Sequence, residues 1–474
     1  MADDGKQITR REFIEYGVGA AAGATLLGPL GQLLAAQPTR KPNLLIVFAD
    51  QMRNASLGCI GNAEIHTPNL DRLAKGGALF RNAISTYPVC TPYRGMLLTG
   101  RYATTTGCVA NGVELNSNEI TVAEVLKQRG YQTGYIGKWH LEKNGQPFVP
   151  KERRQGFDFW RVRNTGGPHW DSFCYGDDPN TQIPLPGYVP DATARIAVEY
   201  IEQHAKQPFC LFLSWGAPHP AYDPPEKYEK MYNSAKLTQR ANVTSNEYRA
   251  NLAKYYGMIT DLDDNMGRLM ATLDKLGIAQ DTIVCFTSDH GDMMGSHGLI
   301  GKNVPYEESI NVPFILRYPR RVKPAKTDTL LGTVGIMPTL LSLCGVPIPK
   351  AVQGTDLSPF LLGKGGKQPQ SVLVERVIGG RDPQSGVDAW RGVRTARYTY
   401  TRGKGKPWLL YDNQQDPYQM RNLIGKPRAK AIQQELEAEL QSQLKKAGDD
   451  FAPVAEWRQR IKGHASRRLD PEQG

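Results

Sequence analysis

The chain has 474 residues, of which 40% are apolar and 22% charged, a balance typical of a folded globular protein and not of a disordered or fibrous one. This length predicts one large domain with a smaller one, or two comparable domains. The formal net charge of +11 favours an anionic ligand or surface. Nucleic acid is not expected as a partner, because the sequence has no zinc-finger spacing, RNA-binding signature or long basic run.

The first 36 residues are interpreted as an export signal of the twin-arginine type. Arg10 and Arg11 precede a mildly apolar run, rich in Gly and Ala, over residues 17–34. Because this run is short for a membrane span and contains Pro29, a removed signal is favoured over a transmembrane helix. We therefore expect twin-arginine export machinery as a partner and a periplasmic or extracellular protein, with an uncleaved membrane tether as the alternative.

Beyond residue 40, apolar runs alternate with helical patterns. Asn43–Ala49 is apolar almost throughout, as in a strand buried on both faces of a parallel sheet. Apolar residues recur every three or four positions over residues 251–276, which predicts an amphipathic helix. Further strands are predicted at residues 132–137, 208–215, 282–287 and 312–318. The alternation predicts an α/β fold with a large mixed, mostly parallel sheet sandwiched by helices.

A second, smaller unit is predicted near the C-terminus. Residues 362–370 (LGKGGKQPQ) are the best candidate for a linker. Strand-like stretches at residues 371–377 and 390–400 follow it, and then a charged helical pattern at residues 427–446. The predicted organisation is a main domain over residues 41–362 and a smaller α+β subdomain, an antiparallel sheet plus a helix, over residues 371–474.

The seven cysteines contain no C-x-x-C pair, so a structural zinc site is not expected. Apart from Cys90 there are six, an even number that permits disulfides in an oxidising compartment without assigning any. Cys210 and Cys285 lie in apolar strand-like runs and are interpreted as core residues.

Polar side chains follow four of the predicted strands. They are Asp50 and Gln51; Lys138 and His140; His219; and Asp289 and His290. Because ligands of open α/β sheets bind beyond the carboxyl ends of the strands, we expect these side chains to meet. Carboxylate and amide oxygens suit a hard cation such as Ca²⁺ or Mg²⁺, and for any one residue strand-end capping is the alternative.

The stretch from Cys90 to Arg94 (CTPYR) predicts a turn that enters a helix at about residue 94. A helix start offers free N–H groups for an anion, and the Arg94 guanidinium adds a planar fork of donors. Further cationic groups would complete a ring, namely Lys138, His140, His219 and Lys302. Such a ring beside a metal fits a substrate oxyanion, sulfate or phosphate, because electrostatic stabilisation dominates transfer of such groups.

These motifs resemble the sulfatase family, within the alkaline-phosphatase-like superfamily. The family core C-x-P-x-R-x-x-x-L-T-G stands here at residues 90–100, and the stretches GKWH (137–140) and SDHG (288–291) are further matches. The ordered set spans about residues 42–354. The resemblance implies an alkaline-phosphatase-like fold and a formylglycine-dependent, type I sulfuric ester hydrolase.

The resemblance also implies how the site is equipped. A formylglycine-generating enzyme would oxidise Cys90 to formylglycine, whose hydrate attacks sulfur and then eliminates sulfate. A divalent metal, Ca²⁺ in preference to Mg²⁺, would be bound by Asp50, Gln51, modified Cys90, Asp289 and His290.

Roles for the remaining residues follow from the same resemblance. Arg94 would orient the hydrated aldehyde, with His140 assisting its proton transfers. Lys138 and Lys302 would bind sulfate oxygens. Either Lys302 or His219 would protonate the leaving alcohol.

The chain departs from the common family pattern at three positions. Gln51 replaces a frequent second Asp, which lowers the negative charge at the metal, and His290 stands where Asn is common. Tyr93 replaces a frequent Ser at the variable position of the modification motif.

Two alternative functions are weighed against a sulfatase. One is a phosphate or phosphonate monoester hydrolase of the same superfamily. The other is an inactive carbohydrate-binding relative, which the presence of Cys90, Arg94 and Lys302 argues against.

The expected substrate is a sulfated small molecule or glycan. Export and the net positive charge of the chain favour a sulfated polysaccharide or one of its fragments as the substrate. Residues 169–171, Tyr175, Trp390 and Arg391 could contact a sugar, and ordinary packing is the alternative for each.

Overall fold

The computed structural model describes residues 41–379 and 388–465 of the chain. The export signal predicted for residues 1–36 lies outside the described residues. Within these ranges, every helix falls short of the length and apolarity that crossing a bilayer requires.

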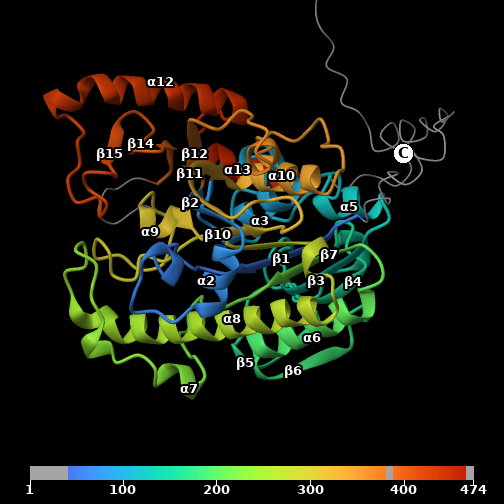
Figure 1. The fold of residues 1–474 in the computed structure, drawn as a ribbon. Coiled ribbons are helices and arrows are strands. Elements are labelled where there is room, and N and C mark those ends of the chain that lie inside the picture. Colours follow the sequence, from blue (N-terminus) through green and yellow to red (C-terminus); the bar gives the residue numbers. More distant parts are fainter. Residues whose placement is uncertain (1–40, 380–387, 466–474) are drawn as a thin grey trace, which may run out of the picture. The chain divides into compact units, whose positions relative to one another are not determined.

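A large sheet forms the centre of the molecule (Figure 1). Its 11 strands within the described residues run in the order β11-β2-β10-β8-β1-β7-β3-β4-β5-β6, with β9 beside β2. The central strands β8, β1, β7, β3 and β4 are parallel neighbours. The bounds are β1 Asn43–Ala49, β2 Ala78–Ile84, β3 Gln132–Lys138, β4 Phe159–Arg163, β5 Trp170–Tyr175, β6 Gln182–Tyr188, β7 Phe209–Ser214, β8 Thr282–Ser288, β9 Asn311–Val312, β10 Phe314–Arg317 and β11 Ala325–Gly332.

The sheet is mixed, and the prediction of a mixed, mostly parallel α/β sheet is confirmed. The strand predicted at residues 312–318 is instead divided by Pro313 into β9 and β10, both antiparallel to β2. Proline has no N–H to donate to a sheet ladder, which explains the interruption. The other edge, β4-β5-β6, is an antiparallel meander.

Helices cover both faces of the sheet, which is why β1 is apolar at almost every position. Leu44 and Ile46 face one core, built with α3 (Cys90–Thr99), α5 (Val122–Lys127) and α10 (Ile336–Leu343). Leu45 and Val47 face the other core, built with α2 (Pro68–Lys75), α6 (Val189–His204) and α8 (Arg249–Lys275). The helix predicted at residues 251–276 is α8, which runs along the lower face in Figure 1.

A second sheet of four antiparallel strands follows residues 362–370. The strand predicted at residues 390–400 is a hairpin, β13 and β14, because residues 396 and 397 form a turn. The bounds are β12 Ser371–Arg376, β13 Trp390–Thr395, β14 Tyr398–Gly403, β15 Pro407–Asp412, α12 Lys430–Ala447 and α13 Val454–Ala465, and the short helices are α4 Ala103–Thr106, α7 Glu226–Glu229, α9 Glu307–Ile310 and α11 Ser358–Leu361.

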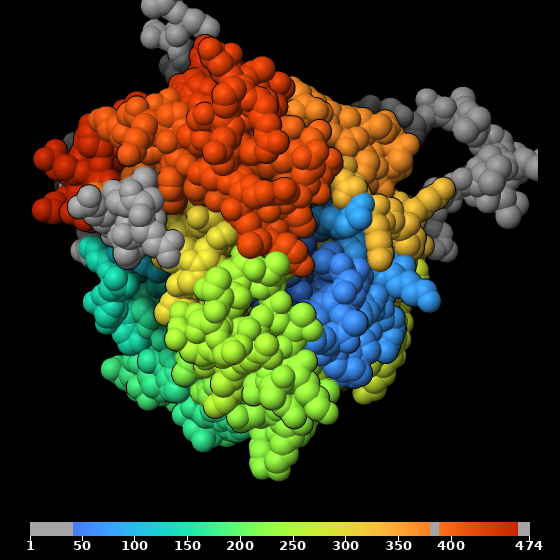
Figure 2. Space-filling view, turned by 90° about the vertical axis from the view of Figure 1, so that its left-hand side faces the viewer, coloured from blue at the N-terminus to red at the C-terminus, as the bar shows by residue number. Residues whose placement is uncertain are grey.

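This second sheet packs directly on the main body of the protein. Tyr87 and Met96 share one apolar core with Leu373 of β12 and Leu436 of α12. Figure 2 shows the orange and red C-terminal segments lying against the yellow and green segments. From Lys41 onward the chain clusters as one compact unit. The boundary at residues 362–370 remains a prediction.

No disulfide joins the seven cysteines, all of which lie in the described ranges as free thiols. Cys210 in β7 and Cys285 in β8 are fully buried, which confirms them as core residues.

Asp261 on α8 is expected to make stability pH-dependent. Its buried carboxyl accepts one hydrogen bond from the side chain of Asn265 (3.1 Å), while Oδ1 has no partner within the described ranges. Burial, followed by nearby Asp191, raises its pKa to about 8. The folded protein therefore holds a proton that the unfolded chain releases above about pH 4, so stability falls as pH rises towards 8, by up to about 1.4 kcal/mol per pH unit.

We expect D261N to remove most of this slope between pH 5 and 7, as measured by urea unfolding. D274N, an exposed position on the same helix, is the control and should keep the wild-type slope. Equal slopes in wild type and D261N would show that Asp261 is not protonated in the folded protein.

Candidate functional site

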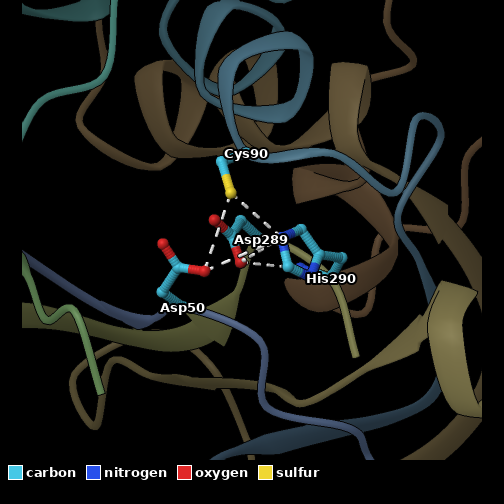
Figure 3. A group of neighbouring side chains, drawn as sticks. All are labelled: Asp50, Cys90, Asp289 and His290. Carbon is cyan, nitrogen blue, oxygen red and sulfur yellow. Dashed lines mark hydrogen bonds and ion pairs between the residues drawn. The ribbon is translucent and has the colours of Figure 1, made fainter. Parts of the chain in front are cut away.

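The predicted polar residues meet at the edge where the central parallel strands end. The backbone N–H of Asp50, after β1, donates to Ala217 O, and that of Asp289, after β8, donates to Ala49 O (both 3.2 Å). These bonds continue the sheet beyond the strands and hold the two carboxylates side by side. The potential ligand atoms of Asp50, Cys90, Asp289 and His290 all lie within 4.8 Å of one another (Figure 3).

Cys90 is the first residue of α3, so the helix begins four residues earlier than predicted. Its Sγ lies 3.2 Å from His290 Nε2 and 3.5 Å and 3.8 Å from the Nζ atoms of Lys302 and Lys138. Burial and Asp50 disfavour the thiolate, but Lys138, Lys302 and His290 outweigh them and hold the pKa of Cys90 well below its usual value. The side chain is thus buried among cations at a helix start.

Arg94, one helical turn after Cys90, links the residues of the site through hydrogen bonds. Its guanidinium is buried and donates to Oδ2 of Asp50 (3.2 Å) and Oδ2 of Asp289 (3.1 Å). It also donates to Lys138 O and Ser214 Oγ, both at 2.7 Å. A buried charge with this many partners is compensated, and it fixes the distance between the two carboxylates.

Lys138 and His140 reach the site from the end of β3. Lys138 Nζ lies 2.5 Å from Asp50 Oδ2. Burial alone would raise the pKa of Asp50, but Lys138, with smaller contributions from other cations, holds it well below its usual value. His140 is buried, and its Nδ1 has no hydrogen-bond partner in the described part of the chain. Burial lowers the pKa of His140, partly offset by a hydrogen bond with Cys90.

Gly137 is required at this turn. Its φ is +101°, and a β-carbon there would lie 2.0 Å from the carbonyl oxygen of Ser214. Only glycine lets β3 approach β7 closely enough to place Lys138 beside Asp50.

Gln51 and Lys302 close the other side. Gln51 Oε1 accepts from Lys302 Nζ (2.6 Å), and Gln51 Nε2 donates to Asp292 Oδ2 (2.6 Å). Buried Asp292 also accepts from the Tyr222 hydroxyl (2.8 Å) and from the backbone N–H groups of Met294 and Gly301. Asp292 therefore turns the Gln51 amide oxygen towards the site and anchors the loop that carries Lys302.

A cavity of about 440 Å³ opens beside these residues. Its walls include His219, Lys302, Tyr222, Tyr248 and Asn251. Burial lowers the pKa of His219, against the opposing effect of Asp50. The cavity has the size and the mixed aromatic and polar lining of a small-ligand site.

The residues present fit a divalent cation. Two carboxylates and the His290 imidazole converge from the loops after β1 and β8, and the Gln51 amide oxygen is linked to this cluster through Lys302 Nζ, which also contacts Cys90 Sγ. Oxygen-rich sets of this kind suit Ca²⁺ or Mg²⁺. Modified Cys90 would complete the set. The imidazole departs from an all-oxygen shell.

The structure brings together the ten predicted site residues and adds three that the sequence analysis did not assign. Asp292 could have been identified from the sequence, because it stands two residues after the predicted pair Asp289-His290. No sequence pattern pointed to Ser214 or Tyr222. Tyr175, Trp390 and Arg391 are buried, with Arg391 paired to Asp449, so ordinary packing is the correct interpretation for them.

Comparisons with known proteins agree with this geometry. The family model described as Sulfatase matches residues 42–346, and that described as N-sulphoglucosamine sulphohydrolase, C-terminal, matches residues 295–446. An ulvan-active sulfatase of Formosa agariphila is 39% identical over 88% of this chain and 83% of its own. An N-acetylglucosamine-6-O-sulfatase of Bacteroides thetaiotaomicron is 26% identical over 90% and 92%. The crystal structure of a candidate sulfatase, yidJ, from Bacteroides fragilis is 34% identical, with a TM-score of 0.80 over 90% of this chain and 99% of that one.

We expect D292N to weaken cation binding at least tenfold. The substituted amide would place an NH₂ group against Gln51 Nε2 or leave the Met294 and Gly301 N–H groups unsatisfied, a cost of about 1–3 kcal/mol. The measurement is the rise in Tm as Ca²⁺ or Mg²⁺ is added to EDTA-treated protein.

D263N is the matched control, because Asp263 is also buried and accepts backbone N–H groups, at Asn69 and Leu70. It should lower the starting Tm but keep the cation response. An unchanged cation response in D292N would contradict the positioning role of Asp292.

Proposed function

Because the chain belongs to the sulfatase family and is a sulfuric ester hydrolase, we propose that its substrate is a sulfated carbohydrate and that Cys90 is converted to formylglycine beside a divalent metal. The observation that carries this is the position of Cys90: it begins a helix, inside a cluster of potential metal ligands, with Lys138 and Lys302 on either side. An ordinary core cysteine has no such surroundings, as Cys210 and Cys285 show.

Formylglycine would supply a hydrated aldehyde as the nucleophile, and the metal would supply positive charge beside it. The rest of the chemistry falls to the chain's own side chains. Lys138 and Lys302, whose Nζ atoms flank Cys90 Sγ, would bind the sulfate oxygens and stabilise the charge that develops on them. Arg94 would hold the carboxylates of Asp50 and Asp289 in place.

Proton transfer requires a base beside the nucleophile and an acid beside the leaving alcohol. His140, with Nδ1 unpaired in the described residues and a hydrogen bond to Cys90, is placed for the first role. His219 and Lys302 both line the 440 Å³ cavity, where the alcohol would leave. We assign the acid to His219, because Lys302 already contacts Cys90 Sγ and Gln51 on the sulfate side.

Three features support a carbohydrate as the substrate. Relatives are named for activity on ulvan and on N-acetylglucosamine 6-O-sulfate. The cavity presents Tyr222 and Tyr248 beside polar groups, a combination that suits a sugar. The net charge of +11 favours an anionic polymer or fragment.

We also propose Ca²⁺ as the resident metal, maturation by a formylglycine-generating enzyme, and export to the periplasm or beyond through a twin-arginine signal in residues 1–36. The oxygen-rich ligand set supports Ca²⁺. The Cys90-Pro92-Arg94 motif supports maturation by a formylglycine-generating enzyme, and the pair Arg10-Arg11 supports twin-arginine export.

The central test is mass spectrometry of the tryptic peptide of residues 82–94 from protein made in its own host. We expect Cys90 to carry the mass of formylglycine or its hydrate. The same protein should turn over 4-nitrophenyl sulfate at least about 100-fold faster than the corresponding phosphate or phenyl phosphonate. An unmodified thiol in active protein would contradict the formylglycine mechanism, and a preference for phosphate would favour phosphoryl transfer.

A second assay separates the two candidate acids. We expect H219Q to lose about 100-fold or more in kcat/KM on a sugar sulfate, whose alkoxide leaves poorly, but less than about tenfold on 4-nitrophenyl sulfate. K302Q, which removes a sulfate contact, should lose activity on both substrates alike. The reverse pattern would make Lys302 the acid.

A further inference from the structure

A second, smaller cavity lies on the opposite side of the site, next to Lys138. It has a volume of about 50 Å³ and is formed where β3, β4 and β7 end. Its walls include Lys138, Arg163, His169, Ser172 and Gly216. Cys90, Asp50 and His219 are not among its lining residues, so it is distinct from both the metal cluster and the 440 Å³ cavity.

Arg163 is the uncompensated charge of this cavity. It is the register partner of Lys138 on the adjacent parallel strand, so the two side chains lie next to each other on one face of the sheet. Lys138 is neutralised by Asp50, but Arg163 has no carboxylate partner within the described residues. It contacts Ser172 Oγ (3.2 Å) and the face of the Phe173 ring (4.6 Å), and its Nε is buried with no hydrogen-bond partner among residues 41–379 and 388–465.

His169 supplies a second polar group, held in a fixed orientation. The residue is only 7% exposed, and its Nδ1–H donates to Asp223 Oδ1 at 2.7 Å. Nε2, which has no hydrogen bond in the described part of the chain, faces the loop at Gly216, where a β-carbon would lie 4.0 Å away. In this tautomer Nε2 carries no proton, so it can accept a hydrogen bond from a sugar hydroxyl.

The next residue offers a surface for a sugar ring. Trp170 is 39% exposed, and its indole N–H donates to Asp223 O, which fixes the ring beside the His169–Asp223 pair. Exposed, anchored aromatic rings are a common platform for the apolar face of a sugar.

We propose that this cavity is a subsite for a second acidic group of the substrate, a carboxylate or a further sulfate, which pairs with Arg163 while a neighbouring hydroxyl bonds His169. The inference rests on the proposed function, because the sulfate under attack would occupy the adjoining site at Cys90. An oxyanion fits because Arg163 brings a positive charge without a carboxylate partner among the described residues, and the cavity lining contains no acidic side chain. A volume of 50 Å³ holds one acidic group but not a whole sugar, so the sugar ring would remain outside the cavity.

The test measures competition with 4-nitrophenyl sulfate turnover by three sulfated disaccharides. One carries a uronate carboxylate, the second is its methyl ester, and the third carries a second sulfate in place of the carboxylate. We expect the inhibition constant of at least one acidic disaccharide to be about tenfold or more below that of the ester, because a charge-assisted hydrogen bond to Arg163 would strengthen binding by about that factor. Whichever acidic compound shows the advantage identifies the source of the group.

The advantage should disappear in R163Q and persist in part in R163K, which keeps a cation. R161Q is the matched control: it makes the same charge change two residues earlier on β4, at a side chain outside the cavity lining. The inference is overturned if the acidic group gives no advantage in wild type, or if the advantage survives in R163Q or is lost equally in R161Q. Absence of aryl sulfate turnover in matured wild-type protein would refute the proposed function itself.

Discussion

The site depends on one buried cation, the Arg94 guanidinium between the carboxylates of Asp50 and Asp289. These acids follow two adjacent parallel strands, so the fold forces two like charges together at one edge of the sheet. Arg94 relieves their repulsion, and it also donates hydrogen bonds to Lys138 O and Ser214 Oγ, at the ends of two further strands of the sheet. Removing one partner of such a buried network leaves an unpaired charge, a cost of about 3–5 kcal/mol. The same residue therefore stabilises the fold and sets the geometry of the metal ligands.

Parallel strand ends explain why residues from distant parts of the chain share one site. β1, β3, β7 and β8 all point their carboxyl ends to the same edge, and each carries a polar or charged site residue at its end or in the loop that follows. α3 approaches that edge with its first residue, Cys90, so the helix start supplies positive potential where an oxyanion would lie. The nucleophile and its cations thus come from different layers of the fold.

The loop from Trp215 to His219 separates two cavities of different character. On one side, the larger cavity contains His219 and Lys302 and has room for a leaving alcohol. On the other, the smaller cavity contains Arg163 and His169 and has room for one acidic group. Chemistry and substrate selection would therefore be performed by neighbouring but separate sets of side chains. Selectivity could change in the smaller set without disturbing the groups around Cys90.

Local patterns were enough to predict the α/β class, the buried central strands, helix α8 and the ten candidate residues that the structure brings together, because periodicity and short motifs are properties of contiguous sequence. They could not predict the division at Pro313, the hairpin after Trp390 or the start of α3 at Cys90, because neighbouring strands and packing set those boundaries. Nor could they assign Ser214, Tyr222 or Arg163, whose roles arise from side chains far away in the chain. The sequence alone thus determined which chemical groups the protein possesses. Tertiary structure decided which of them are compensated, as Lys138 is by Asp50, and which, like Arg163, still lack a partner of opposite charge among the described residues.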